Sequence, residues 1–280
     1  KKEAHGKYAK NHCGKQCIPL GSEYYYQSDQ FTKGMKLYLL LDYDGTLTPI
    51  AKKPLQAVLS SKRKKVLRQL ACHPSVKLAV VSGRELSFAK KIIGIRNIIY
   101  VGNHGLEIFA DGKYWMHPGA KKAIPLLKRI KTKLMNNLHY RGIWIEDKGL
   151  TLSIHYRFLN MKKYKPFKND LMQNICLWKG KVAIMHGKKV FEIRPPVKWD
   201  KGAAVRALIP KRRTNSNLII YIGDDTTDED AFRALKNRAL TFRVGMSGQT
   251  CAKYRLKNTA EVYKLLSAMT KLIKGDRRVF

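Results

Sequence analysis

The stretch LYLLLDYDGTLTP, residues 37–49, decides the fold of this chain. Its apolar run ends at two carboxylates, Asp42 and Asp44, and Gly45 and Thr46 follow them. An apolar run bounded by turn residues is typical of a buried strand that ends in a polar loop. If the strand pattern continues past this run, both aspartates lie on one face, where two negative charges are costly without a cation or a shared proton. The pair therefore favours a magnesium site, in which carboxylates leave the other coordination positions to water and a phosphate.

Length and composition place the chain among the globular proteins. At 280 residues it can bury a substantial core and form one domain or two. Its apolar stretches fall short of the roughly 20 residues of a membrane helix, and residues 1–5 show no signal-peptide core. The five cysteines, an odd number, fit no disulfide framework. We therefore expect a soluble, cytoplasmic protein with reduced thiols and no membrane association.

The formal net charge of +36 is the unusual feature of the composition. An excess of this size is typical of proteins that bind nucleic acid or anionic membranes. The basic residues are spread through the chain, however, and do not gather in one arm or one RNA-binding motif. We interpret the charge as a diffuse solvated surface that attracts a phosphorylated small molecule, and binding to nucleic acid is not expected. A basic, non-catalytic binding module on the same fold is the alternative from another functional class.

Strand and helix patterns alternate in the first part of the chain and again after Asp200. This order is typical of a doubly wound sheet with helices on both faces. We therefore predict an α/β fold with a Rossmann-like parallel sheet as its core. The predicted core elements are strands at 37–42, 76–81, 98–101, 218–222 and 239–244, and helices at 62–70, 85–93, 201–208, 228–235 and 260–273.

The middle of the chain has a different pattern. Asp111-Gly112 is a hairpin turn signal between two short apolar stretches, and further strands and two helices follow it. Hairpins with two helices indicate an α+β module, which we interpret as an inserted lid. The predicted elements are helices at 120–138 and 164–176 and strands at 142–146, 150–157, 181–185 and 189–194. The predicted domains are an N-terminal arm or linker at 1–36, a core at 37–112 and 198–280, and an α+β cap at 113–197.

Three polar motifs follow three predicted strands of the core. Asp42, Ser82 and Asp224 come directly or closely after a strand, and ligands of a parallel sheet bind beyond the carboxyl ends of its strands. Each motif alone has a structural alternative. Ser82 can cap a helix, Lys201 can be one of many solvated lysines, and residues 224–230 can be an acidic helix start. Because the motifs would converge at one rim, we interpret the ordered set as one catalytic site.

The ordered motifs resemble those of the haloacid-dehalogenase superfamily of phosphotransferases. The resemblance implies that Asp42 is a nucleophile that forms an aspartyl-phosphate, and that Asp44 acts first as general acid and then as general base. It also implies a Mg²⁺ cofactor. The remaining implied roles are metal binding by Asp42, the Asp44 carbonyl and Asp224, phosphoryl binding by Ser82 and Lys201, and orientation of Lys201 or metal-bound water by Asp225 and Asp228.

Further segments resemble the trehalose-6-phosphate phosphatase branch of that superfamily. They are GNHGLE at 102–107, IEDKGL at 145–150, HYR at 155–157, GK at 187–188 with EIRPP at 192–196, and GDDTTDEDAF at 223–232. A disaccharide phosphate presents many hydroxyls and one dianion, which charged and bifunctional side chains on a lid would bind. The substrate-binding residues that the resemblance implies are Thr46, Asn103, His104, Lys148, His155, Arg157, Lys188 and Glu192.

Several of these residues also have a structural interpretation. Arg157 and Glu192 can form an ion pair within the cap sheet, and Lys148 can be a turn residue. His104 and His155 can be hydrogen-bonded groups of partly apolar strands. The resemblance favours sugar binding, and a cap that closes over the core would complete the sugar site and exclude water.

The function predicted from the sequence is hydrolysis of trehalose 6-phosphate by a Mg²⁺-dependent phosphatase of trehalose biosynthesis. A phosphatase for another sugar phosphate, such as sucrose phosphate, is the nearest alternative, because the core motifs specify the reaction and not the sugar. Members of the resembled family are often fused to a trehalose-phosphate synthase domain. A synthase domain or protein is therefore the expected partner besides the small-molecule substrate.

Overall fold

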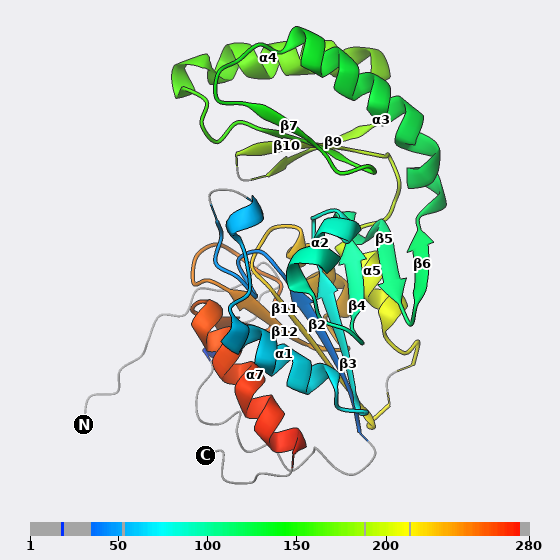
Figure 1. The fold of residues 1–280 in the computed structure, drawn as a ribbon, viewed down its shortest axis with the longest axis vertical. Helices are drawn as coiled ribbons and strands as arrows, with labels where there is room; N and C mark the ends of the chain where they lie inside the picture. The colour runs from blue at the N-terminus through cyan, green and yellow to red at the C-terminus, as the bar shows by residue number, and fades with distance from the viewer. Residues whose placement is uncertain (1–17, 20–34, 52–53, 188, 213, 275–280) are drawn as a thin grey trace, which may run out of the picture.

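The computed structural model describes residues 18–19, 35–51, 54–187, 189–212 and 214–274. Figure 1 shows a lower part built on a large sheet and an upper part in which two helices lie over a smaller sheet. The large sheet has the strand order β1-β13-β12-β11-β2-β3-β4-β5-β6, and the small one has the order β7-β8-β10-β9. This confirms the predicted fold class, an α/β core with an α+β insertion.

The first motif lies on the central strand of the large sheet. β2 (Lys36–Asp42) lies between β11 (Asn217–Gly223) and β3 (Val76–Val81) and runs parallel to both. The register pairs Asp42 with Val81, so that both strands end at the same level. The loops after β2, β3 and β11 therefore meet at one rim of the sheet.

The outer strands complete the sheet with two kinds of pairing. The strands next to β3 and β11 continue the parallel arrangement, whereas on the far side of β4 the pairing of β4 with β5 and that of β5 with β6 are both antiparallel. The parallel outer strands are β4 (Ile99–Gly102), β12 (Leu240–Val244), β13 (Tyr254–Leu256) and β1 (Ile18–Pro19), and the antiparallel ones are β5 (Glu107–Ala110) and β6 (Lys113–Met116).

Two predictions about this sheet need correction. Residues 113–116 were expected to start the cap, but they form β6 at the edge of the core sheet, because the turn at residues 111–112 keeps them paired with β5. The cap sequence therefore begins after Met116. The sequence analysis also missed β13 and β1, and β1 belongs to the segment that was expected to be an arm.

Helices cover both faces of the core sheet. Alternate residues of β2 show this, because Leu39 and Leu41 pack into one apolar cluster and Leu40 packs into another. Strands buried on both faces carry nearly continuous apolar runs, as β2 does. The first cluster is covered by α1 (Ser61–Ala71), α2 (Leu86–Ile93) and α7 (Thr259–Ile273), and the second by α5 (Lys201–Leu208) and α6 (Asp228–Leu235).

The cap has its own apolar core. Leu127, Ile130 and Leu134 of one helix pack with Phe167 of the other and with Ile154 of the sheet. The cap elements are α3 (Pro118–Asn137), α4 (Tyr164–Ile175), β7 (Trp144–Asp147), β8 (Leu152–His155), β9 (Ala183–Gly187) and β10 (Val190–Arg194). Short 3-10 turns occur at η2 (Pro54–Gln56), η3 (Asn103–Gly105), η4 (Met161–Lys163) and η5 (Cys176–Trp178).

The chain passes between core and cap at two neighbouring connections. One joins β6 to α3, and the other joins β10 to α5. The ring of Trp115, near the end of β6, and the ring of Trp199, in the second connection, have centroids 5.3 Å apart. Trp199 Nε1 also donates to the carbonyl of Gly105 at 2.7 Å. In the described part of the chain, none of the helices has the length and apolar character needed to cross a membrane.

Candidate active site

Lys201 lies between two aspartates at the rim of the core sheet. Its Nζ donates to Asp42 Oδ1 at 2.6 Å and to Asp228 Oδ1 at 2.7 Å. The three residues are at most 4% exposed. Opposite charges in direct contact avoid the large cost of an unpaired buried charge. The structure thus brings together Asp42 and Lys201, which are 159 positions apart in the sequence.

Local helix geometry places Lys201. It is the first residue of α5, and the preceding Asp200 caps the helix by accepting a backbone N–H at 2.8 Å. Gly202 lies where α5 crosses α6, and an added Cβ there would lie 2.5 Å from the carbonyl oxygen of Asp230. This close approach of the two helices carries Lys201 to Asp228, the first residue of α6.

The Asp228 carboxylate is fully used within the protein. Besides Lys201, its Oδ1 accepts from the hydroxyl of Tyr221 at 2.6 Å. Its Oδ2 accepts from the backbone N–H groups of Asp224 and Asp225 at 3.0 and 2.9 Å. A carboxylate offers about four acceptor positions, so Asp228 has none left for a metal. Asp228 thus holds both the lysine and the loop after β11.

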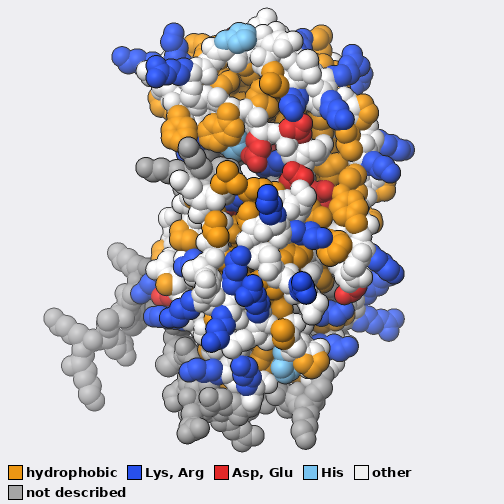
Figure 2. Space-filling model, in the orientation of Figure 1, with side chains coloured by type: hydrophobic (Ala, Val, Ile, Leu, Met, Phe, Trp, Pro, Cys, Tyr) orange, Lys and Arg blue, Asp and Glu red, His pale blue; other side chains and the backbone are white. Residues whose placement is uncertain are grey.

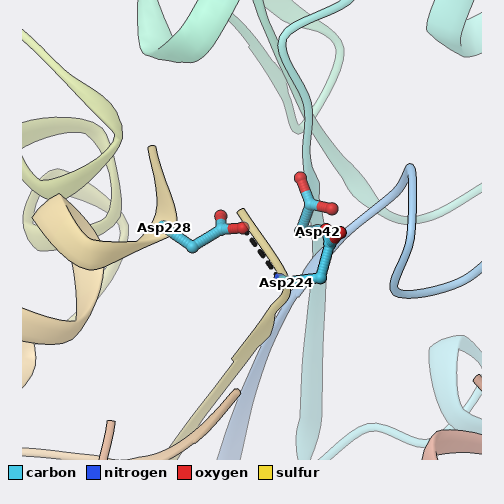
Figure 3. Close-up of side chains that lie close together, drawn as sticks. All are labelled: Asp42, Asp224 and Asp228. Carbon is cyan, nitrogen blue, oxygen red and sulfur yellow. Dashed lines mark hydrogen bonds between the residues drawn. The ribbon is translucent and has the colours of Figure 1, made fainter. Parts of the chain in front are cut away.

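Asp42 and Asp224 form the part of the site that fits a metal ion. One oxygen of each of Asp42, Asp224 and Asp228 lies within 4.8 Å of the others. Figure 3 shows Asp42 and Asp224 close together, and Asp228 reaches toward Asp224 from a helix. Asp224 Oδ1 is buried and has no hydrogen-bond partner among the described residues. Gly45, at φ +86°, makes room for this carboxylate, because an added Cβ would lie 2.0 Å from Asp224 Oδ2. Carboxylate oxygens in this arrangement suit Mg²⁺.

The charges of the site agree with that assignment. Burial raises the pKa of Asp42 well above its usual value, the nearby Asp228 raises it further, and Lys201 only partly opposes this. Burial and Asp228 likewise raise the pKa of Asp224 to about 7. A divalent cation beside these two carboxylates would favour their charged forms.

Asp44 is held by an arginine that the sequence analysis did not single out. β2 ends at Asp42, so Asp44 lies in the following turn and not on the strand face that the alternation suggested. Arg84 donates from Nε to Asp44 Oδ2 at 2.7 Å and from Nη2 to Oδ1 at 2.6 Å. The expected repulsion between two neighbouring carboxylates is thus reduced, because Asp44 has its own cation.

Two buried hydroxyls lie in the loops that follow β2 and β3. Ser82 is 1% exposed, and its Oγ accepts from the backbone N–H of Arg84 at 3.1 Å. Thr46 is fully buried, and its Oγ1 has no hydrogen-bond partner among the described residues. A buried hydroxyl without a partner is costly, so the place of Thr46 suits a ligand oxygen.

A second charged cluster joins the core to the cap. Glu192 of β10 lies 3.1 Å from His104 Nε2 through Oε2 and 3.3 Å from Lys148 Nζ through Oε1. Lys148 also donates to the carbonyl of Gly83 at 3.1 Å. Burial would raise the pKa of Glu192, but His104 and Lys148 outweigh it and hold that pKa well below its usual value. Burial lowers the pKa of His104. Three predicted substrate-binding residues thus meet at the boundary.

Asn103 connects core and cap through its own side chain. Its Nδ2 donates to Glu107 at 2.7 Å and to the carbonyl of Lys148 at 3.0 Å, and its Oδ1 accepts from Thr151 at 3.0 Å. The residue is fully buried and has a positive φ of 47°. Its polar atoms are engaged in the protein, so the structure places it as a bridge and not as a group open to substrate.

The remaining predicted residues lie farther out. His155 contacts Glu146 at 2.7 Å and stacks on Trp144 at 4.2 Å between ring centroids. Arg157 donates to the carbonyl of Ala51 at 2.9 Å, in the loop that follows the first motif. Asp225 is exposed, and its carboxylate accepts from the backbone of the next residue. Lys188 lies outside the described residues.

Arg84 and Tyr221 are the site residues that sequence reasoning missed. Arg84 stands two positions after Ser82, so its place next to a strand-end motif was the available signal. Tyr221 interrupts an apolar strand with a hydroxyl, and a buried hydroxyl needs a partner. Its partner is Asp228.

This fold, an α/β core with an α+β insertion, is shared with a known hydrolase. A haloacid dehalogenase-like hydrolase from Bacteroides thetaiotaomicron has the same fold, with a TM-score of 0.57 at 17% identity, over 84% of this chain and 99% of the other. The family model of trehalose-phosphatase matches residues 40–268. The chain therefore belongs to the trehalose-phosphatase family of enzymes.

Individual relatives agree with this assignment. Trehalose 6-phosphate phosphatase RA3 of Zea mays is 30% identical over 266 residues, which cover 88% of this chain and 73% of the relative. The crystal structure of a trehalose-6-phosphate phosphatase related protein has a TM-score of 0.75 at 25% identity and covers 86% of this chain and all of its own.

Proposed function

We propose that this chain is a Mg²⁺-dependent phosphatase that hydrolyses trehalose 6-phosphate to trehalose and phosphate through an aspartyl-phosphate on Asp42. The observation that carries the proposal is the contact of Lys201 with Asp42 at 2.6 Å, beside an Asp224 carboxylate with an unpartnered oxygen. Membership of the family supports the choice of substrate.

Two displacements at phosphorus make up the proposed reaction. In the first, the Asp42 carboxylate attacks phosphorus, the bond from phosphorus to the sugar oxygen breaks, and Asp44 gives that oxygen a proton. In the second, water attacks the same phosphorus, Asp44 takes a proton from it, and the bond to Asp42 breaks to release phosphate. Lys201 places a compact positive charge beside the nucleophile, and the Thr46 hydroxyl donates to a phosphoryl oxygen.

Asp42, Asp224 and the carbonyl of Asp44 would hold the metal ion. When bound, Mg²⁺ supplies the positive charge that offsets the carboxylates and the phosphate dianion. The raised pKa values of Asp42 and Asp224 support this, because burial and the nearby Asp228 disfavour the charged form of each carboxylate and a cation would favour it.

The cap boundary is the place that we assign to the sugar. His104, Lys148 and Glu192 supply donors and an acceptor there, which suits the hydroxyls of a disaccharide. Only His104 belongs to the core, so the cluster assembles when the cap lies on the core. We infer that residues 117–197 act as a lid whose closure excludes water and completes the sugar site.

Phosphate release from a panel of sugar phosphates tests the proposal. Trehalose 6-phosphate, sucrose 6-phosphate and glucose 6-phosphate are compared at equal concentration, with Mg²⁺ and with a chelator. We expect turnover of trehalose 6-phosphate to exceed that of the others and to stop with the chelator. Asp42→Asn should lower kcat on the order of 10⁴-fold, because the nucleophile is lost and binding remains. The control is Asp111→Asn, the same change at an exposed aspartate.

Three results would contradict parts of this proposal. Equal turnover across the panel contradicts trehalose 6-phosphate as the substrate. Full activity with the chelator contradicts the metal requirement. Full activity of Asp42→Asn contradicts the covalent intermediate.

A further inference from the structure

We propose that Arg84 is the positioning residue of Asp44, the carboxylate that exchanges a proton with the leaving sugar oxygen and then with water. The inference rests on the proposed function, in which Asp44 is the general acid and base. Arg84 is the group that would hold the Asp44 carboxylate in place. Arg84 itself touches neither phosphorus nor the leaving group in this account.

The contact between Arg84 and Asp44 fixes both the place and the plane of the carboxylate. Nε binds Oδ2 at 2.7 Å and Nη2 binds Oδ1 at 2.6 Å, which is a two-pronged arginine-carboxylate pair. A single hydrogen bond would leave the carboxylate free to rotate. Because Asp44 lies in a turn after β2, its side chain needs such a partner to point in one direction.

Arg84 is held as firmly as a positioning group requires. The residue is 9% exposed. Its backbone N–H donates to Ser82 Oγ at 3.1 Å, and its carbonyl accepts from the backbone of Asn103 at 2.7 Å. The guanidinium carbon lies 5.4 Å from the ring centre of Tyr43 and 5.2 Å from that of Phe88. Two aromatic rings and two backbone contacts therefore restrict its motion.

The contact leaves Asp44 able to react. The side chain of Asp44 is 39% exposed, whereas that of Arg84 is 11% exposed. The two arginine bonds use two of the roughly four acceptor positions of a carboxylate. The other positions remain for the proton in transit, so the arginine can stay bound through both displacements. The direction of the carboxylate is then the same for the leaving oxygen and for the attacking water.

Two phosphate esters with different leaving groups test this role. A sugar alkoxide leaves poorly without a proton, whereas p-nitrophenolate leaves without help. Arg84→Ala should therefore lower kcat/KM for trehalose 6-phosphate about 100-fold, within the range of general acid catalysis, and lower kcat/KM for p-nitrophenyl phosphate less than about threefold. Arg84→Lys keeps the charge without the two-pronged geometry, so we expect it to lose most of the same activity. Added guanidinium should restore part of the Arg84→Ala loss.

A matched control separates this role from general stability. Arg243→Ala removes a part-buried ion pair with Glu229, 2.7 Å apart, at another place in the core. We expect it to leave the ratio of the two substrates unchanged. Thermal unfolding of each variant shows whether it is folded, and Arg84→Lys serves if Arg84→Ala does not fold.

Three outcomes would overturn the assignment. They are an equal loss on both esters, a rise in KM at unchanged kcat, and full activity of Arg84→Lys. The proposed function is tested separately by the wild type. If it fails on trehalose 6-phosphate and hydrolyses another alkyl phosphate, the substrate is wrong. The role of Arg84 is then decided on that alkyl phosphate against p-nitrophenyl phosphate.

Discussion

The cluster around Lys201 and the cluster around Glu192 are both buried and charged, but different parts of the chain build them. Asp42, Lys201 and Asp228 all come from the core. In the second cluster, His104 comes from the core, whereas Lys148 and Glu192 come from the cap. The first cluster therefore holds at any position of the cap, and the second requires the cap to lie where it does here. In the function proposed above, the reaction would belong to the first cluster and sugar recognition to the second.

The two clusters also differ in the direction in which the pKa values of their carboxylates are shifted. Glu192 has His104 and Lys148 beside it, and its pKa is held well below the usual value in spite of burial. In the core cluster, burial and neighbouring carboxylates raise the pKa values of Asp42 and Asp224 in spite of Lys201. Asp224 has no cation in contact with it among the described residues, whereas Glu192 contacts Lys148 at 3.3 Å. This difference supports the proposal of a cation at the first cluster and of sugar hydroxyls at the second.

Among the changes considered, removal of Lys201 from the core cluster should have the largest effect on activity. We expect Lys201→Met to lower kcat at least about 10³-fold for every phosphate ester, because the positive charge beside the nucleophile is lost. It should also lower the free energy of unfolding by about 3–5 kcal/mol, since Asp42 and Asp228 are left buried without their cation. Phosphate release and urea unfolding measure the two effects. Lys62→Met, at an exposed position of α1, is the control. Loss on the sugar phosphate alone would contradict the assignment of chemistry to this cluster.

A methyl group added at Gly45 should weaken Mg²⁺ binding, and we expect its effect on activity to be smaller than that of Lys201→Met. The added Cβ would lie 2.0 Å from Asp224 Oδ2, so that carboxylate must move. We expect Gly45→Ala to raise the Mg²⁺ concentration for half-maximal activity at least about tenfold, as displacement of a supporting group does in metal sites. Gly112→Ala introduces the same change at φ +77° with no atom within 4 Å, so it matches the backbone strain without the contact. Equal Mg²⁺ requirements in both variants would show that Asp224 is not a ligand.

A change in the cap cluster should have the smallest effect on activity, and the effect should be confined to the sugar phosphate. Glu192→Gln removes the charge that His104 and Lys148 share. A hydrogen bond to a charged group contributes about 1.5–3 kcal/mol, so kcat/KM for trehalose 6-phosphate should fall roughly 10- to 100-fold. The value for p-nitrophenyl phosphate, which has no disaccharide, should stay nearly constant. Asp170→Asn on α4 is the control within the cap. An equal loss on both esters would place Glu192 in the chemistry and remove the separation between the clusters.

Local sequence patterns were sufficient to predict the bounds of an element where those bounds depend only on the element's own residues. β3, α5 and α6 begin and end at the predicted residues, because each apolar pattern is bounded by a polar or turn residue. Membership of a sheet depends on a distant partner instead. Residues 113–116 were therefore assigned to the wrong part of the fold, and the three residues of β13 were missed.

The same distinction explains which features of the candidate active site could be predicted from the sequence. Asp42, Ser82 and Asp224 follow strands, so their positions alone placed them at one rim. The partner of Asp44 depends on where the Arg84 side chain reaches, which no strand pattern specifies. The internal contacts of Asn103 depend on the cap turn that lies against it, so its engaged polar atoms were not predictable either.

The two neighbouring connections between core and cap set the kind of movement that is available to the cap. Because the chain enters and leaves the cap beside the contact of Trp115 with Trp199, the lid movement proposed above would be a rotation about that contact. Lys148 lies near this pivot, since it lines the same small cavity as Met116. Arg157 lies beyond the opposite end of β8 and reaches across to Ala51. In such a rotation the contact of Arg157 with Ala51 would break first, and the space between core and cap would open on the side away from the tryptophans.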